Sequence, residues 1–489
     1  MSNPSLKDKT VTGLFWSFSD SAAAQGTQFV VGIILARLLL PEEFGLIGMI
    51  MIVTAVSGAL INSGFGAALI QKKDVTQADY STVFFYNLAV SFVLYIIIYF
   101  SAGAVASFFD QPQLVAILRV LSLGIIINAF ALVQRTILTK KIDFKTQTRI
   151  TVISAVLSGA VAILLAYNGW GVWSLVVKML LLNFLQTALL WFYNRWYPSL
   201  VFSPESFRRL FGFGSKLLVS GLIDTVYQNL FYVIIGRFFS AAALGYYTRA
   251  NNFKNLASQN ITGVIQRVTY PVLSSIKDDP ERLKNGYKKT IQSTVFITFP
   301  IMLGMAAAAE PMILFLIGDR WLQSVPYLQL LCFAGMLYPL HALNLNMLMV
   351  KGRSDLFLKL EIAKKVTIIP LIVIGIQWGI TGLIGALIAG SFIAFFMNSF
   401  YSGRMIGYSM REQVGDILPA MCTAIIMAGA MYLGAMGLPD IPLLKLTAQI
   451  VIGIAVYLAI AKITAIHGYE YLYTIIEERI RRYTSIEIG

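Results

Sequence analysis

The sequence predicts an all-α integral membrane protein with about 14 transmembrane helices. The chain of 489 residues is 57% hydrophobic and only 13% charged. Its mean hydropathy is +0.73, and apolar stretches of membrane-spanning length recur from one end to the other. Soluble globular domains carry about 25% charged residues. The composition therefore predicts a membrane protein.

The expected spans are apolar stretches of roughly 20 residues or more. They run at residues 11–37, 43–70, 81–108, 113–134, 148–168, 171–193, 210–236, 243–273, 290–316, 325–350, 357–377, 380–402, 414–436 and 441–465. The first stretch, 11–37, is not a cleavable signal peptide, because Asp20, Gln25 and Gln28 lie at its centre and no small-residue cleavage site follows.

Basic residues predict the orientation of the chain. With the N-terminus in the cytoplasm, most of the 38 Lys and Arg residues fall on the cytoplasmic side, whereas the opposite loops hold only Arg37, Arg237 and Arg320. Loops rich in Lys and Arg stay in the cytoplasm during insertion. Both termini are therefore expected there. The net charge of +14 needs no nucleic acid partner, because anionic lipid is the neighbour of these loops.

An internal repeat organises these spans. Matching residues recur 200 positions apart, and later 210 apart, in the pairs Gln28 and Gln228, Arg37 and Arg237, Gly45 and Gly245, Lys141 and Lys351, and Gly169 and Gly379. Each repeat holds six spans, an even number, so both repeats enter the membrane from the same side. The prediction is two parallel six-helix lobes plus two C-terminal helices. The expected parts are an N-terminal lobe at 1–200 (helices 1–6), a C-terminal lobe at 201–405 (helices 7–12), helices 13–14 at 406–470, and a cytoplasmic tail at 471–489.

The eighth stretch has a polar face. It contains the run RANNFKNLASQNITGVIQR, which on a helix places its arginines and most of its amides on one side and Phe253 and Ile261 on the other. The run is roughly 27 Å long, close to the thickness of the hydrocarbon core. Such a face must meet water or a polar cargo. The candidate cavity residues on it are Arg249, Asn252, Asn255, Gln259, Asn260, Gln266 and Arg267.

Helices 1 and 7 add further polar groups. Gln28 on helix 1, and Lys216 and Gln228 on helix 7, are candidate cavity residues. Asp20 and Asp224 are candidates for coupling to protons or sodium ions, because carboxylates inside the membrane are functional by default. The alternative reading is that these polar groups bond neighbouring helices together.

No catalytic constellation is present, so the protein is not expected to be an enzyme. The chain has no glycine-rich phosphate loop with Lys-Ser/Thr and no soluble region large enough for a glycosyltransferase domain. Its two cysteines and two histidines, at 332, 422, 341 and 467, have no metal-ligand spacing. Neither a cofactor nor a metal is expected.

The segments ARLLLPEEFGLIGM, INSGFGAALIQKKD, STVFFYNL, LGYYTRANNFKNL and YPVLSSIKDD carry a resemblance that covers essentially the whole chain. They resemble the polysaccharide-transporter branch of the multidrug/oligosaccharidyl-lipid/polysaccharide (MOP) superfamily. Within it, the likeness is nearest to Wzx-type flippases of the colanic-acid and teichuronic-acid export group. The resemblance implies two lobes arranged in a V, a cationic central cavity and a bacterial inner-membrane location.

The resemblance also implies a function. Such a protein moves an undecaprenyl-diphosphate-linked oligosaccharide or polysaccharide repeat unit from the cytoplasmic to the periplasmic leaflet by alternating access. Its expected partners are this lipid-linked glycan, membrane lipids, and the polymerase and glycosyltransferases of the same exopolysaccharide pathway. Two alternatives remain. One is a drug/cation antiporter of the same superfamily, which is expected to have an acidic, aromatic cavity. The other is a non-transporting membrane partner of a glycan synthase complex.

Overall fold

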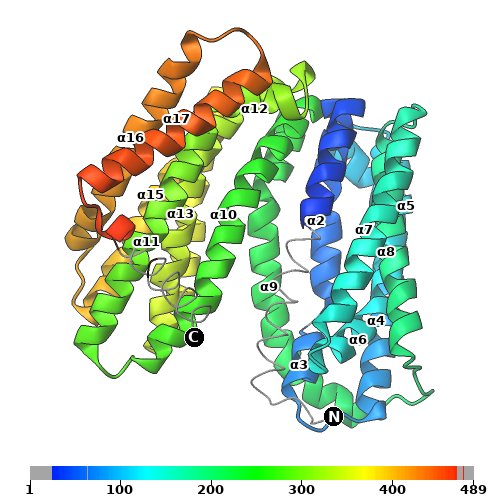
Figure 1. Cartoon of the computed structure of the whole chain (residues 1–489). Helices are drawn as coiled ribbons and strands as arrows, with labels where there is room; N and C mark the ends of the chain where they lie inside the picture. The colour runs from blue at the N-terminus through cyan, green and yellow to red at the C-terminus, as the bar shows by residue number, and fades with distance from the viewer. Residues whose placement is uncertain (1–24, 63, 471–476, 478–489) are drawn as a thin grey trace, which may run out of the picture. The chain divides into compact units, whose positions relative to one another are not determined.

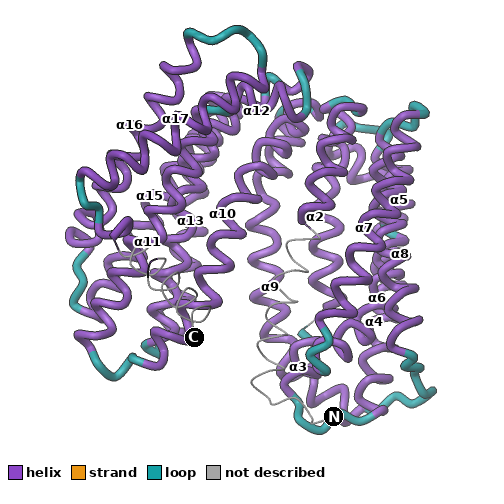
Figure 2. The backbone as a smooth tube through the Cα atoms, in the orientation of Figure 1, coloured by secondary structure: helices purple, strands orange, loops and turns teal. Residues whose placement is uncertain are grey.

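The computed structural model describes residues 25–62, 64–470 and 477, with the side chains at 213, 216, 217 and 268 excepted. Among these residues every regular element is a helix (Figures 1 and 2), which confirms the all-α prediction. Helical backbone covers residues 25–38. The first labelled helices are α2 (Pro41–Asn62), α3 (Phe65–Gln71), α4 (Gln77–Phe109), α5 (Leu114–Leu121), α6 (Leu123–Lys140), α7 (Phe144–Tyr167), α8 (Val172–Asn194), α9 (Pro204–Phe238) and α10 (Ala241–Ser275). There follow α11 (Pro280–Ala307), α12 (Ala309–Leu316), the 3-10 turn η1 (Asp319–Trp321), α13 (Ser324–Val350), α14 (Ser354–Gly375), the 3-10 turn η2 (Ile376–Trp378), α15 (Gly379–Ile406), α16 (Met410–Met436) and α17 (Pro442–Ile463).

Eleven stretches of the described residues are long and apolar enough to cross a membrane. One of them, residues 354–406, contains both α14 and α15, and α10 is absent because its composition is too polar. The first expected span begins outside the described residues. A total of about 14 spans is compatible with these helices and stays a prediction.

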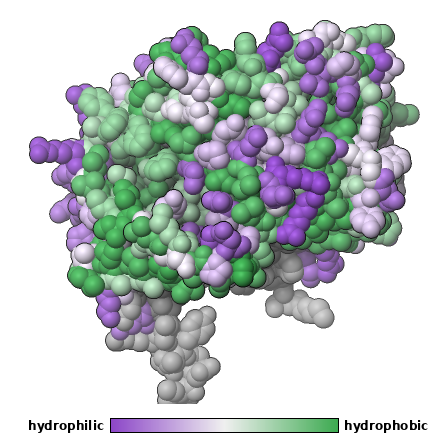
Figure 3. Space-filling view, turned by 90° about the horizontal axis from the view of Figure 1, so that it is seen from above, coloured by the Kyte–Doolittle hydropathy of each residue, from purple (hydrophilic) through white to green (hydrophobic). Residues whose placement is uncertain are grey.

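Large apolar side chains lie exposed along the helices, as lipid-facing surfaces require. Phe100 on α4 is 78% exposed, Leu164 on α7 is 63% exposed and Leu433 on α16 is 67% exposed. Seen from above, one face of the molecule instead mixes hydrophilic and hydrophobic residues (Figure 3). The chain is a multi-pass membrane protein.

The chain forms two compact units, Met1–Thr248 (unit 1) and Arg249–Gly489 (unit 2). In unit 1, α4 packs on α6, α6 on α8, and α7 on α8. The same order of partners recurs in unit 2, where α11 packs on α13, α13 on α15, and α14 on α15. The helices α16 and α17 pack on each other and on α11. This recurrence is what a six-helix repeat with two added helices requires. The predicted lobe boundary at residue 200 follows the sequence repeat, whereas the two compact units meet at residues 248 and 249. The boundary at residue 200 therefore stays a prediction.

The turns that follow α6 and α13 show the repeat at the level of single hydrogen bonds. The backbone N–H of Asp143 donates to the carbonyl oxygen of Leu138 at 3.0 Å. In the second turn, 210 positions later, the N–H of Arg353 donates to the carbonyl oxygen of Leu348 at 2.9 Å. The residue before each donor has a positive φ, 58° at position 142 and 71° at position 352. Both helices therefore end in the same kind of left-handed turn.

Helix α2 and the first turns of α10 approach each other closely within unit 1. A Cβ atom added to Gly45 would lie 1.7 Å from the carbonyl oxygen of Ala241. A Cβ atom added to Gly245 would lie 1.9 Å from the carbonyl oxygen of Pro41. The two contacts are equivalent in the repeat. Gly45 and Gly245 are 200 positions apart, and so are the residues that they contact, Pro41 and Ala241. Only glycine lets two helix backbones come this close.

The linker between α8 and α9, residues 195–203, is bonded to helices that precede it in the chain. The Nε2 atom of Gln77 on α4 donates to the carbonyl oxygen of Tyr197 at 2.7 Å. The Nε2 atom of Gln134 on α6 donates to the carbonyl oxygen of Trp196 at 2.8 Å. The start of α9 is thus held against the earlier helices of unit 1.

A buried carboxylate organises the start of α4. Asp79 is fully buried, and its Oδ2 atom accepts from the backbone N–H of Thr76 at 2.8 Å, which completes a capping box at the helix N-terminus. Lys72 pairs with the same oxygen. Arg209 of α9 lies 3.2 Å from Oδ1. One side chain therefore connects the loop before α4 to α9.

Candidate functional site

The polar face predicted on the eighth span lies on α10. Of the predicted cavity residues, Asn252, Gln259 and Arg267 are exposed, and Arg249, Asn255, Asn260 and Gln266 are partly exposed. The amide of Asn260 donates to the carbonyl oxygen of Leu256, one turn earlier in the same helix, at 2.7 Å. Ala250 and Phe253, from the apolar side, are buried. One helix thus presents seven long polar side chains at least partly exposed, and their contact with a cargo stays a prediction.

Helix α10 also has buried polar groups that the sequence did not single out. Ser258 is 1% exposed and Thr262 is 3% exposed. The hydroxyl of Thr262 donates to the carbonyl oxygen of Ser258 at 2.6 Å, so its polar atom is satisfied within the helix. Small hydroxyl residues at such positions let helices pack closely in a membrane. These residues support α10 rather than extend its polar face.

Arg249 contacts an aromatic ring of unit 2. Its Cζ atom lies 5.6 Å from the ring centre of Trp321, which is fully buried in η1. A guanidinium at this distance over an indole is stabilised by the ring's negative face. The contact orients the guanidinium of Arg249, whose Nε atom is buried, toward η1.

Lys254 is a second basic residue of α10 near α13. A Cβ atom added to Gly335 of α13 would lie 2.8 Å from both Cγ and Cδ of Lys254, so the lysine stem lies directly over this glycine. The sequence did not mark Lys254 as a site residue because it falls off the face shared by Arg249 and Arg267. The glycine that admits its side chain is 81 positions away, and a single helix pattern shows no such pair.

The candidate residues of helices 1 and 7 are placed only in part. On α9, Asp224 is partly exposed and Gln228 is exposed, whereas Lys216 lies in the helix with its side chain outside the described part. Gln28 is exposed on the helical segment 25–38. Asp20 lies outside the described residues. Their roles as cavity or coupling residues stay predictions.

A further polar cluster occurs where α13, α14 and α15 pack. The Nε2 atom of His341 lies 2.9 Å from the hydroxyl oxygen of Ser391. Glu361 pairs with Lys364 one turn along α14. The sequence indicates no metal site at His341, and its hydrogen-bond partner on α15 is 50 positions away in the chain. Within the described residues no three His, Cys, Asp or Glu side chains gather to hold a metal ion.

Comparison with known sequences gives a family match. A family model described as polysaccharide biosynthesis protein matches residues 34–326. The teichuronic acid biosynthesis protein TuaB of Bacillus subtilis (strain 168) is 26% identical over 355 residues, which cover 72% of this chain and 74% of that protein. The lipopolysaccharide biosynthesis protein WzxC of Escherichia coli (strain K12) is 27% identical over 384 residues, 78% of this chain and 77% of that protein.

Comparison with solved structures gives the fold. The lipid II flippase MurJ in an inward closed conformation matches with a TM-score of 0.75 at 16% identity, covering 93% of this chain and 98% of that one. An inward-facing MATE multidrug transporter of the MOP superfamily matches with a TM-score of 0.61 at 17% identity, covering 78% of this chain and 94% of that one. The prediction of a MOP-like fold is confirmed.

Proposed function

Because the chain belongs to the polysaccharide biosynthesis protein family, we propose that it is a flippase for a lipid-linked glycan. Its cargo is an undecaprenyl-diphosphate-linked oligosaccharide or polysaccharide repeat unit. The cargo moves from the cytoplasmic to the periplasmic leaflet of the bacterial inner membrane by alternating access. The protein acts as a transporter and not as an enzyme. The polymerase and glycosyltransferases of the same pathway act beside it.

The observation that carries the proposal is the polar face of α10. The lipid tail of such a cargo stays in hydrocarbon, whereas its sugar-diphosphate head cannot enter hydrocarbon unaided. A diphosphate is best held by guanidinium groups, which bind two oxygens at once, and Arg249 and Arg267 supply two of them. The hydroxyls of the sugars are suited to amides such as Asn252, Asn255 and Gln259. Helix α10 therefore offers guanidinium groups for the diphosphate and amide groups for the sugars along its length.

The orientation follows from the basic loops. Both termini lie in the cytoplasm, and the two repeats form the two lobes, at residues 1–200 and 201–405, that alternately expose the cargo site. Residues 406–470 add helices 13 and 14. Net export also needs either removal of the product or an ion gradient, and Asp20 and Asp224 are the coupling candidates.

The test is transport by the purified protein in liposomes that contain the fluorescent lipid-linked glycan. Arg249→Ala combined with Arg267→Ala is expected to lower the initial rate of flipping at least about tenfold, since each guanidinium removed takes roughly 1.5–3 kcal/mol of charge-assisted bonding with it. Arg282→Ala, an exposed arginine in the first turn of α11, is the matched control and should keep the parent rate.

Three results would contradict the proposal. Parental flipping by the double variant would remove the diphosphate role of the two arginines. Absence of flipping by the well-folded parent would favour a non-transporting partner of a glycan synthase. Transport of cationic drugs in the same liposomes, without glycan transport, would favour a drug/cation antiporter.

A further inference from the structure

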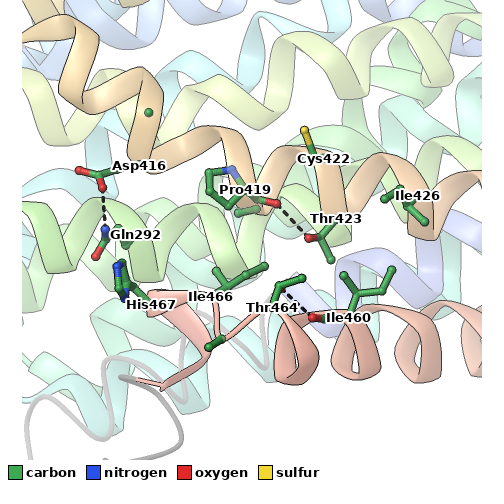
Figure 4. Close-up of a pocket in the computed structure, with 14 residues that line it drawn as sticks. Gln292, Asp416, Pro419, Cys422, Thr423, Ile426, Ile460, Thr464, Ile466 and His467 are labelled. Atoms are coloured by element: carbon green, nitrogen blue, oxygen red, sulfur yellow. Dashed lines mark hydrogen bonds between the residues drawn. The ribbon is translucent and has the colours of Figure 1, made fainter.

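A pocket of about 550 Å³ lies between α11, α16 and α17 in unit 2 (Figure 4). This volume is within the range of sites that hold small molecules. Its walls are uneven in polarity. Asp416, Gln292 and His467 lie at one end of the pocket, whereas Ile426 and Ile460 lie at the other (Figure 4). From Asp416 to Ile426 the helix α16 rises by about 15 Å. The pocket is therefore amphipathic along the length of the helix.

The polar end is a prearranged set of hydrogen bonds around Asp416. Its Oδ1 atom accepts from Nε2 of Gln292 at 2.9 Å. Its Oδ2 atom accepts from the hydroxyl of Tyr408 at 2.6 Å, and Nζ of Lys288 lies 3.1 Å from the same oxygen. Burial raises the pKa of Tyr408 above its usual range, and its hydrogen bond to Asp416 acts in the same direction. Tyr408 therefore keeps its proton and remains a donor to the carboxylate.

A negative and a positive charge meet at this polar end, because Asp416 lines the pocket and Lys288, which lies beside the lining residues, pairs with it. The carboxylate of Asp416 has up to about four acceptor positions, and the three donors leave one for a cation. The ammonium of Lys288, which is 40% exposed, has three protons and gives one to Asp416. Two remain for an anion. His467 is exposed on the opposite wall, where its Nδ1 atom lies 3.5 Å from a carboxylate oxygen of Glu470 and its Nε2 atom adds a further donor or acceptor.

The other end of the pocket suits a hydrocarbon chain. Ile426 is 55% exposed, and Pro419 and Cys422 between the two ends are also exposed. In a membrane protein, exposed apolar walls that continue from a polar mouth meet lipid chains rather than water.

We propose that this pocket binds a membrane phospholipid whose headgroup carries both a phosphate and an amine. The amine takes the open acceptor position of Asp416, the phosphate takes the donors of Lys288, and one acyl chain lies along α16 past Pro419 to Ile426. The bound lipid is a resident of the membrane and not the transported glycan. A diphosphate with no amine beside it would place its negative charge against Asp416, which costs affinity.

The lipid preference is the first test. Phosphatidylethanolamine and phosphatidylglycerol with identical acyl chains are added in equal amounts to the full-length protein in detergent, and bound lipid is counted by native mass spectrometry. Phosphatidylethanolamine is expected to exceed phosphatidylglycerol by about threefold to fivefold, the effect of one partly exposed charge pair. Asp416→Asn should bring the ratio close to one. Glu412→Gln, on the same helix but outside the pocket, should leave the ratio unchanged.

The chain position is the second test, and it does not depend on the fold tolerating a change at Asp416. Ile426 lines the pocket and is 55% exposed, whereas its neighbour Ile425 does not line it and is 53% exposed. Ile426→Trp is expected to reduce bound phosphatidylethanolamine several-fold, and Ile425→Trp is expected to leave it unchanged.

Three outcomes would overturn the proposal. Equal binding of the two lipids by the parent would remove the role of the headgroup amine. The same occupancy in Ile426→Trp and Ile425→Trp would place the lipid elsewhere. Displacement of phosphatidylethanolamine by the lipid-linked glycan at equal concentration would make the pocket a cargo site. All three readouts measure equilibrium binding without transport, so they are independent of whether the protein flips a glycan.

Discussion

The buried carboxylate of Asp79 compensates the charges of two basic residues. It is fully buried, and both Lys72 and Arg209 pair with it. Arg209 is 52% exposed, so water screens the loss of its partner, whereas Lys72 and the backbone N–H of Thr76 lose their acceptor, at a cost of roughly 1–3 kcal/mol. Asp79→Ala is therefore expected to lower the midpoint of thermal unfolding in detergent by several degrees. Asp74→Ala, at an exposed position in the loop before α4, is the control and should have little effect. An unchanged midpoint for Asp79→Ala would mean that the pair contributes no net stability.

Several residue contacts could not be predicted from the sequence because their partners are distant in the chain. Arg209 lies 130 positions from Asp79, and no local spacing connects the two. In unit 2, the stem of Lys254 lies over Gly335, and these two residues are also too far apart in the chain for a local pattern to connect them. By contrast, the polar face of α10 depends only on the helical period and on the residues of that helix, so the sequence predicts it directly.

At the scale of elements, the close crossing of α2 and α10 predicts that two Gly→Ala substitutions destabilise the protein, although the same substitution usually stabilises a helix. Replacing glycine by alanine within a helix normally stabilises it by about 0.5–1 kcal/mol. At Gly45 and Gly245 the added methyl would overlap a carbonyl oxygen, so each substitution is expected to destabilise the protein by roughly 1–3 kcal/mol. Thermal unfolding of each variant measures this.

The same two helices supply matched controls for this prediction. A Cβ atom on Gly58 of α2 or on Gly263 of α10 would meet nothing within 4 Å. Alanine at either position should be neutral or slightly stabilising. If all four alanine variants behaved alike, the close crossing would not be present in the protein in solution.

The repeat itself was visible in the sequence through pairs such as Gly45 and Gly245, but its physical cause was not. The structure gives that cause for these two glycines, because each one admits the backbone of the other's helix. The pocket of α11, α16 and α17 left no sequence signal at all. Its polar end combines residues from three segments of the chain, and only the packing of those helices brings them together.

For the whole molecule, the basic loops predict a topology that can be measured. Single cysteines are introduced after Cys332 and Cys422 are replaced by serine, and labelling is done with a reagent that does not cross the membrane. Residues 135–145, 275–288 and 471–489 should react only from the cytoplasmic side. Residues 109–112 and 437–440 should react only from the periplasmic side. A periplasmic C-terminus would contradict both the even number of spans and the repeat.

Coupling to an ion gradient is also a property of the whole molecule. If Asp20 or Asp224 carries a proton or sodium ion through the cycle, then Asp20→Asn or Asp224→Asn should flip the glycan at a rate that no longer responds to the gradient. The measurement is flux in proteoliposomes with and without imposed proton and sodium gradients. The parent protein is the reference. A parental response in both variants would exclude both carboxylates as the coupling site.

The anchored linker at residues 195–203 has a consequence for how the protein is made. Helices α4 and α6 leave the ribosome before the linker does. When the carbonyl groups of Trp196 and Tyr197 emerge, the side chains of Gln134 and Gln77 are already available to bond them. All the groups of these two bonds are therefore made before α9, so the linker can be bonded to the earlier helices without waiting for the rest of the chain.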